Sequence, residues 1–115
     1  MSDTDTIFGK IVRGEIPSEF IYEDEHCIAI ADANPQAAVH VLVIPKKAIP
    51  RLVDASADDQ ALLGHLMLAV GKVAEQLGVA DAFRLVVNNG ADVGQTVFHL
   101  HLHIIAGQIL NEQKL

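Results

Sequence analysis

Basic residues are scarce in this chain. Lysine and arginine together number 8 against 15 aspartates and glutamates, so the formal net charge is −7. Nucleic acids and anionic membranes are usually bound through a basic stripe, and the nearest feature here is the pair Lys46-Lys47. We therefore expect neither a nucleic acid nor a membrane surface as a partner. A small anionic ligand stays compatible with this charge if local hydrogen-bond donors offset the overall repulsion.

Cysteine and long apolar runs are also sparse. The single cysteine, Cys27, cannot form an internal disulfide, and no cationic or histidine-paired motif surrounds it, so we interpret it as a small buried packing residue. No apolar stretch approaches the about 20 residues that a transmembrane helix needs. No basic-then-apolar leader opens the sequence. These features predict a cytoplasmic protein.

The length and composition fit one compact domain. The chain has 115 residues, half of them apolar, which is enough for one hydrophobic core and too little for a second domain. We expect a single domain over residues 1–115, with flexible tails at residues 1–5 and 108–115. No internal repeat or low-complexity segment is present.

A short helix is predicted near the N-terminus. Apolar residues recur at helical spacing from Ile7 to Val12, Asp5 or Thr6 can cap the start, and Gly14 can end the last turn. The side chains of Ile7 and Phe8 could either pack on a sheet or face a ligand, and the pattern does not separate these alternatives.

One long helix and four other strands are also predicted. The capping box Ser56-Ala57-Asp58-Asp59 opens the helix and Gly78 closes it, with strands at residues 20–22, 26–31, 39–45 and 83–88. We interpret His26 as solvated and His65, beside the helix's apolar stripe, as solvated or interfacial. The stripe is wide for one small sheet, so we expect part of it to face another subunit. It consists of Leu62, Leu63, Leu66, Met67, Val70, Val73, Ala74 and Leu77.

The most informative stretch is GQTVFHLHLHIIAG, residues 94–107. His99, His101 and His103 alternate with leucines, and a period of 2 among residues of high β propensity predicts a strand. The three imidazoles would share one surface. The residues that alternate with them would point to the opposite face and pack on the core, which fixes the register of the strand. The predicted core-facing residues are Phe98, Leu100, Leu102 and Ile104.

Two kinds of chemistry suit three clustered imidazoles. They can bind zinc, although no Cys, Asp or Glu lies within the strand to complete a tetrahedron. Alternatively, one neutral imidazole is a nucleophile while its neighbours hold charge on an anion. Gly94, Gln95 and Thr96 add backbone N–H groups, an amide and a hydroxyl, which are suitable donors to phosphate oxygens. This set favours a phosphoryl or nucleotidyl substrate, and His40 on another strand is either structural or part of the same site.

Three segments carry a resemblance to a known family. The run HLHLHII, residues 99–105, resembles the histidine triad, HxHxHxx with apolar x, that names the HIT superfamily. DTIFGKIVRGEIP, DANPQAAVHVLVIPKK and GQTVFHLHLH, in that order, resemble its Hint branch, the nucleoside phosphoramidate hydrolases. The resemblance implies an α+β fold of the HIT type, in which an antiparallel sheet of about five strands carries one long and one short helix, and it implies a homodimer.

The resemblance also implies roles for individual residues. His101 matches the nucleophile that attacks the α-phosphorus and becomes transiently nucleotidylated. His99 and His40 match the residues that set its proton and tautomer, and His103 matches a phosphate contact. The implied substrate-binding residues are Gly94, Gln95 and Thr96 for the phosphate and leaving group, Asp32 for the ribose, Asn88 near the sugar and phosphate, and Ile7, Phe8, Ile11, Ile30 and Ala33 for the purine.

This chain departs from the family pattern at a few positions. Thr96 stands where many relatives have serine, and Ile30 where some have an aromatic residue. The tail, residues 108–115, lacks the Trp-Pro segment that some Hint proteins extend toward the partner's site, because the chain contains no tryptophan. The third triad residue is His103 rather than glutamine, which disfavours the nucleotidyl-transferase branch.

The implied function is hydrolysis of purine nucleoside phosphoramidates, or related AMP or GMP conjugates, without a metal or other cofactor. A dinucleoside-polyphosphate hydrolase of the same superfamily is the nearest enzymatic alternative. A nucleotide-binding regulatory or scaffold protein, whose catalysis is incidental, is an alternative from another class.

Overall fold

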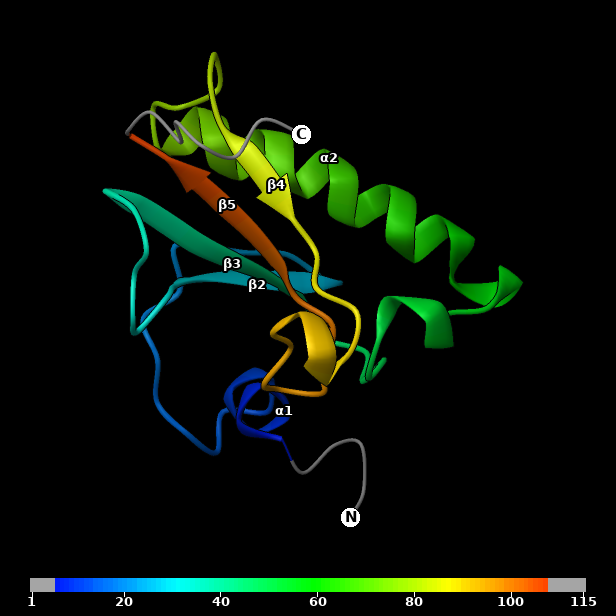
Figure 1. Ribbon diagram of the computed structural model, residues 1–115. Helices are drawn as coiled ribbons and strands as arrows, with labels where there is room; N and C mark the ends of the chain where they lie inside the picture. Colours follow the sequence, from blue (N-terminus) through cyan, green and yellow to red (C-terminus); the bar gives the residue numbers. More distant parts are fainter. Residues whose placement is uncertain (1–5, 108–115) are drawn as a thin grey trace.

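The protein has an α+β fold built on a five-stranded antiparallel sheet with the strand order β1-β2-β3-β5-β4. The structure is a computed structural model, and it describes residues 6–107. The long helix α2 crosses one face of the sheet, and the short helix α1 lies at the other side (Figure 1). The tails predicted to be flexible lie outside the described residues. The elements are α1 (Ile7–Val12), β1 (Tyr22–Glu23), β2 (Cys27–Ala31), β3 (Val39–Pro45), α2 (Gln60–Gln76), β4 (Arg84–Val86) and β5 (Leu102–Ala106), with 3₁₀ turns at Leu52–Asp54, Ala57–Asp59 and Ala91–Val93.

Local capping sets the ends of both helices. The Thr6 hydroxyl accepts a hydrogen bond from the Gly9 N–H at 3.0 Å and begins α1 as predicted. Ser56 and Asp59 form the predicted capping box, which opens a 3₁₀ turn that continues into α2. Gly78 follows α2 with φ of 76°, a left-handed conformation that glycine adopts without strain.

Both faces of the sheet are buried, and alternate residues of a strand pack into two different hydrophobic clusters. On β3, Val41 and Val43 pack with α2, whereas Leu42 and Ile44 pack on the opposite face with residues of α1. This double burial explains why β2 and β3 read as nearly continuous apolar runs. On β5, Leu102 and Ile104 belong to the α2 core, as predicted, so His103 projects from the other face.

The histidine stretch is only partly a strand, which corrects the prediction. The strand β5 begins at Leu102, because the Leu100 N–H already donates to the Ile49 carbonyl at 2.6 Å instead of joining the sheet. Leu100 is buried as predicted, but Phe98 is 38 % exposed and does not face the core. The three imidazoles therefore do not share one open surface.

Other predictions need smaller corrections. Met67 is 52 % exposed, so the sheet does not cover this part of the predicted apolar stripe of α2. His65 is half-buried, and its ring bonds to Asp24 of the β1–β2 connection. Cys27 is fully buried, as predicted. Among residues 6–107, neither helix has the length and apolar character needed to cross a membrane.

Candidate nucleotide-phosphate site

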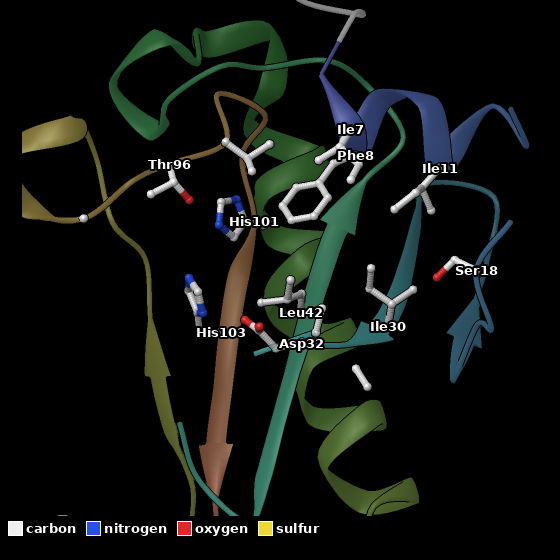
Figure 2. A pocket seen from close by; sticks show the side chains of 14 residues that line it. Ile7, Phe8, Ile11, Ser18, Ile30, Asp32, Leu42, Thr96, His101 and His103 are labelled. Atoms are coloured by element: carbon white, nitrogen blue, oxygen red, sulfur yellow. The ribbon is translucent and has the colours of Figure 1, made fainter. Parts of the chain in front are cut away.

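A cavity of about 380 Å³ opens between α1, the sheet and the loop that precedes β5. Its polar and apolar residues are segregated, as Figure 2 shows. Thr96, His101, His103 and Asp32 lie toward one end, and Ile11, Ile30 and Ser18 lie toward the other. An apolar slot that ends in a group of hydrogen-bonding side chains suits a ligand with a flat apolar part and an anionic part.

The hydrogen bond at one ring nitrogen determines the tautomer of His101. Its Nδ1 lies 2.8 Å from the carbonyl oxygen of His99, so Nδ1 carries the proton and donates it. The lone pair of a neutral ring is then on Nε2. The ring of Phe8 packs edge-on against His101, with the centroids 4.9 Å apart and the planes at 76°. His101 is thus held as an oriented neutral imidazole in the wall of the cavity.

His99 is a buried support. Its Nε2–H donates to the carbonyl of Pro45 at 2.7 Å, and the ring is 1 % exposed. Its Nδ1 has no hydrogen-bond partner in the part of the chain that the structure describes. His99 therefore acts on the cavity through its backbone carbonyl, which fixes the His101 ring.

A chain of hydrogen bonds connects the loop after β2 to His103. The Gln36 N–H donates to His40 Nδ1 at 3.0 Å, so a neutral His40 carries its proton on Nε2. That Nε2 lies 2.9 Å from His103 Nδ1 and 3.3 Å from Asp32 Oδ2. His103 then keeps its own proton on Nε2, which has no partner within residues 6–107. This arrangement leaves His103 with a buried N–H that no described residue accepts.

Burial keeps the triad neutral. Removal from water lowers the pKa of His99 and of His101 below the ordinary value for histidine. The pKa of His103 is lowered to about 4 by burial, together with repulsion from His101 and His40. The triad rings are therefore neutral at pH 7, with a lone pair on His101 Nε2 and a proton on His103 Nε2.

The structure brings most of the anticipated residues to this cavity. His101, His103, Asp32, Gly94, Thr96, Ile7, Phe8, Ile11, Ile30 and Ala33 line it. Ile7 is 50 % exposed at the rim, whereas Phe8 packs on the core as well, so α1 both covers the sheet and faces the cavity. His40 and His99 do not line the cavity. The His40 ring bonds to the His103 ring, and the His99 carbonyl bonds to the His101 ring.

Two anticipated residues lie elsewhere. The Gln95 side chain is 3 % exposed, and its amide is occupied by bonds to the Gly90 N–H and to the carbonyls of Pro50 and Val97. It braces the loop rather than offering a donor to phosphate. Asn88 is also absent from the lining of the cavity.

Four lining residues were not anticipated. Leu42 could have been found, because it shares strand parity with His40 and projects to the same face. Ser18 and Val97 reach the cavity through the path of loops and have no sequence signal, whereas Ala31 lies at the end of β2. Ser18 places a hydroxyl at the otherwise apolar end (Figure 2).

The comparisons with known proteins agree with this geometry. Residues 13–109 match the HIT domain family. The chain belongs to this family. It is 62 % identical over 104 residues to an uncharacterised HIT-like protein of Synechocystis, with 90 % of this chain and 91 % of that protein covered.

Solved structures of HIT proteins have the same fold. A HIT family hydrolase from Clostridium thermocellum is 44 % identical with a TM-score of 0.91, covering 96 % of this chain and 97 % of that one. A histidine triad protein from Clostridium difficile is 41 % identical with a TM-score of 0.90, covering 99 % and 100 %. This HIT protein therefore resembles its relatives over nearly its whole length.

Proposed function

We propose that this HIT protein hydrolyses purine nucleoside phosphoramidates, or related nucleotidyl conjugates, to a nucleoside monophosphate. The reaction passes through a nucleotide covalently bound to His101. The observation that carries the proposal is the bond from His101 Nδ1 to the His99 carbonyl, because it leaves Nε2 as a free nucleophile in the cavity wall.

The first step exchanges one bond to phosphorus for another. The Nε2 lone pair of His101 attacks the α-phosphorus, the P–N bond breaks, and its electron pair leaves with the amine. The amine needs a proton, which the Thr96 hydroxyl or a neighbouring histidine can relay. Thr96 turns its hydroxyl toward the His101 side of the cavity (Figure 2). His103 Nε2–H supports the charge that develops on the phosphate oxygens.

The second step regenerates the enzyme. Water attacks the phosphorus, the bond from phosphorus to Nε2 breaks, and the proton of the water returns to the relay. One difficult displacement is thus divided into two easier ones. The His99 carbonyl remains bonded to Nδ1–H throughout, so the ring is in the correct tautomer for the next turnover.

The apolar end of the cavity supports a nucleobase as the other part of the substrate. Phe8, Ile11 and Ile30 form a slot with few polar edges, and Asp32 lies between this slot and the histidines, where a ribose hydroxyl can bond to its carboxylate. We expect purine nucleotides to bind more tightly than pyrimidine nucleotides, because they bury more apolar surface. Calorimetry with AMP, GMP and CMP measures this, and equal affinities would contradict the assignment of the slot.

Rapid acid quench with a substrate labelled at the α-phosphate tests the covalent step. We expect the label on His101 after peptide mapping. His101→Ala should lose more than the about 10²- to 10⁴-fold that general acid–base groups contribute, and it should still bind AMP. The matched variants His40→Asn and His103→Asn should be slowed within that range. Label on another histidine, or full activity in His101→Ala, would end the assignment.

A substrate panel separates the alternatives. The panel contains AMP and GMP phosphoramidates and diadenosine polyphosphates, each measured as kcat/KM. A preference for the phosphoramidates supports the proposal, whereas a preference for the polyphosphates would assign the same nucleophile to the related hydrolase activity. If His101→Ala has no turnover but still performs the cellular function of the wild-type protein, the protein acts as a nucleotide-binding regulator.

A further inference from the structure

A second group of reactive side chains lies away from the nucleotide cavity, where the β1–β2 connection meets α2. Asp24 is its centre. Its Oδ1 accepts the backbone N–H groups of His26 and Cys27 at 2.8 and 2.9 Å. Its Oδ2 accepts the Tyr22 hydroxyl at 2.8 Å and the His65 ring at 2.7 Å. Asp24 thereby joins the hairpin to the long helix.

Three types of metal-ligating atom converge there. A carboxylate oxygen of Asp24, the sulfur of Cys27 and a ring nitrogen of His65 all lie within 4.8 Å of one another. They come from three places in the chain: the connection, β2 and α2. We propose that Asp24, Cys27 and His65 bind a divalent transition-metal ion, with zinc as the best match, and that the ion fastens the β1–β2 hairpin to α2.

The donor types select the class of ion. A thiolate and an imidazole favour zinc over magnesium or calcium, which prefer sets of oxygen ligands. The two backbone N–H groups on Asp24 Oδ1 orient the carboxylate, as supporting hydrogen bonds do around many metal sites.

Metal binding would release the proton of the Cys27 thiol and would move the proton of a neutral His65 ring from Nε2 to Nδ1. Without metal, the His65 ring N–H occupies the space between the ring and Asp24 Oδ2. The Cys27 thiol is buried, and a metal ion would bind it as the thiolate. The three donor atoms already lie close together. Small movements of their side chains would place them around a tetrahedral ion.

A hollow lies on the His65 side of the trio, although neither Asp24 nor Cys27 lines it. The hollow has a volume of about 260 Å³ and is lined by His26, Ala61, Leu62 and His65. The rings of His26 and His65 are 4.8 Å apart, and the His26 side chain is 53 % exposed. We expect a water molecule or the His26 ring to supply the fourth ligand from this side.

The other trio that meets the same distance limit, among the described residues, is Asp32, His40 and His103. It lies at the nucleotide cavity and contains no sulfur. Since Cys27 is the single cysteine of the chain, a thiolate–metal signal reports only the Asp24 site. This difference makes a decisive experiment possible with the full chain.

Cobalt(II) is the probe, added to protein that has first been stripped with a chelator. We expect a thiolate-to-cobalt charge-transfer band that saturates at one ion per chain, and a rise in Tm when zinc replaces cobalt. His65→Gln should weaken binding by more than the about 10- to 100-fold that loss of a supporting group causes. His103→Asn is the matched control and should keep both the band and the rise in Tm.

Two results would overturn the proposal. One is the absence of a charge-transfer band in the wild-type protein. The other is a zinc-induced rise in Tm of the same size in Cys27→Ala as in wild type, which would place the ion elsewhere. Circular dichroism of the metal-free variants verifies their folding, and His65→Gln still decides the question if Cys27→Ala does not fold. No readout depends on turnover.

Discussion

The three triad histidines carry the same side chain in different surroundings, and their hydrogen bonds give them different capacities. His101 donates from Nδ1 to a backbone carbonyl and keeps a free lone pair. His103 receives a bond at Nδ1 and keeps a free N–H. His99 is buried on Pro45. Each ring bonds to a different neighbour, so one residue type can supply the proposed nucleophile, the proposed donor to phosphate and a buried structural residue.

The shifted pKa values predict how turnover depends on pH. The pKa of His101 is lowered by burial, so its nucleophilic neutral form persists in the folded protein below the ordinary histidine value of about 6.5. Activity should therefore be flat above about pH 6.5 and should fall at lower pH, as His101 gains a proton. A profile of kcat/KM against pH measures the position of this acid limb.

Phe8→Ala provides the complementary variant. It exposes the His101 ring to water, which should raise its pKa toward the ordinary value and move the acid limb to higher pH. Phe8→Leu keeps apolar cover and should leave the limb nearer its wild-type position. An acid limb that stays in place in Phe8→Ala would show that cover by Phe8 does not set the pKa.

At the scale of elements, the register of β3 and β5 assembles the proton chain. His40 stands opposite Ile105, and His103 stands opposite Leu42, so the two histidines are diagonal neighbours on one face. Diagonal positions of an antiparallel pair are about 7–8 Å apart, which long or aromatic side chains can bridge. The Nε2 of His40 reaches the Nδ1 of His103 in this way, although 63 residues separate them in sequence.

The cap of α1 gives a prediction about an element. Thr6→Ala removes the acceptor for the Gly9 N–H and should destabilise the helix start by about 1 kcal/mol. Because α1 supplies Phe8 and Ile11 to the cavity wall, we expect KM for a nucleotide substrate to rise while kcat changes less. Thr6→Ser retains the cap and serves as the control. Equal KM values in Thr6→Ala and Thr6→Ser would show that the cap of α1 does not affect substrate binding.

At the scale of the whole molecule, the outer face of α2 carries apolar surface. Leu68 is 71 % exposed and Met67 is 52 % exposed, on the side away from the sheet. We propose that this face meets a second copy of the chain in a homodimer. Burial of one large apolar side chain stabilises by about 1.5–3 kcal/mol, which favours covering it.

Sedimentation velocity measures the predicted dimer. The wild-type protein should sediment as a dimer at micromolar concentration, and Leu68→Lys should shift it to the monomer. Lys72→Glu, which changes charge without removing apolar area, is the control and should remain dimeric. A wild-type monomer would refute the proposed interface.

The sequence alone predicted what depends on near neighbours in the chain. The bounds of α1, the capping box before α2 and the whole of β3 were predicted correctly, because capping and hydrophobic periodicity are local effects. The sequence also indicated the chemistry of the candidate site, since no other stretch of the chain has alternating histidines.

Only the tertiary structure decided how these groups are placed. A bond from the Leu100 N–H to the Ile49 carbonyl keeps half of the histidine run out of the sheet, and an internal network occupies the Gln95 amide. His65, interpreted as solvated or interfacial, meets Asp24 across 41 positions. Local propensity contains no information about such partners, because they become neighbours only when the chain closes its long-range contacts and buries both faces of the sheet.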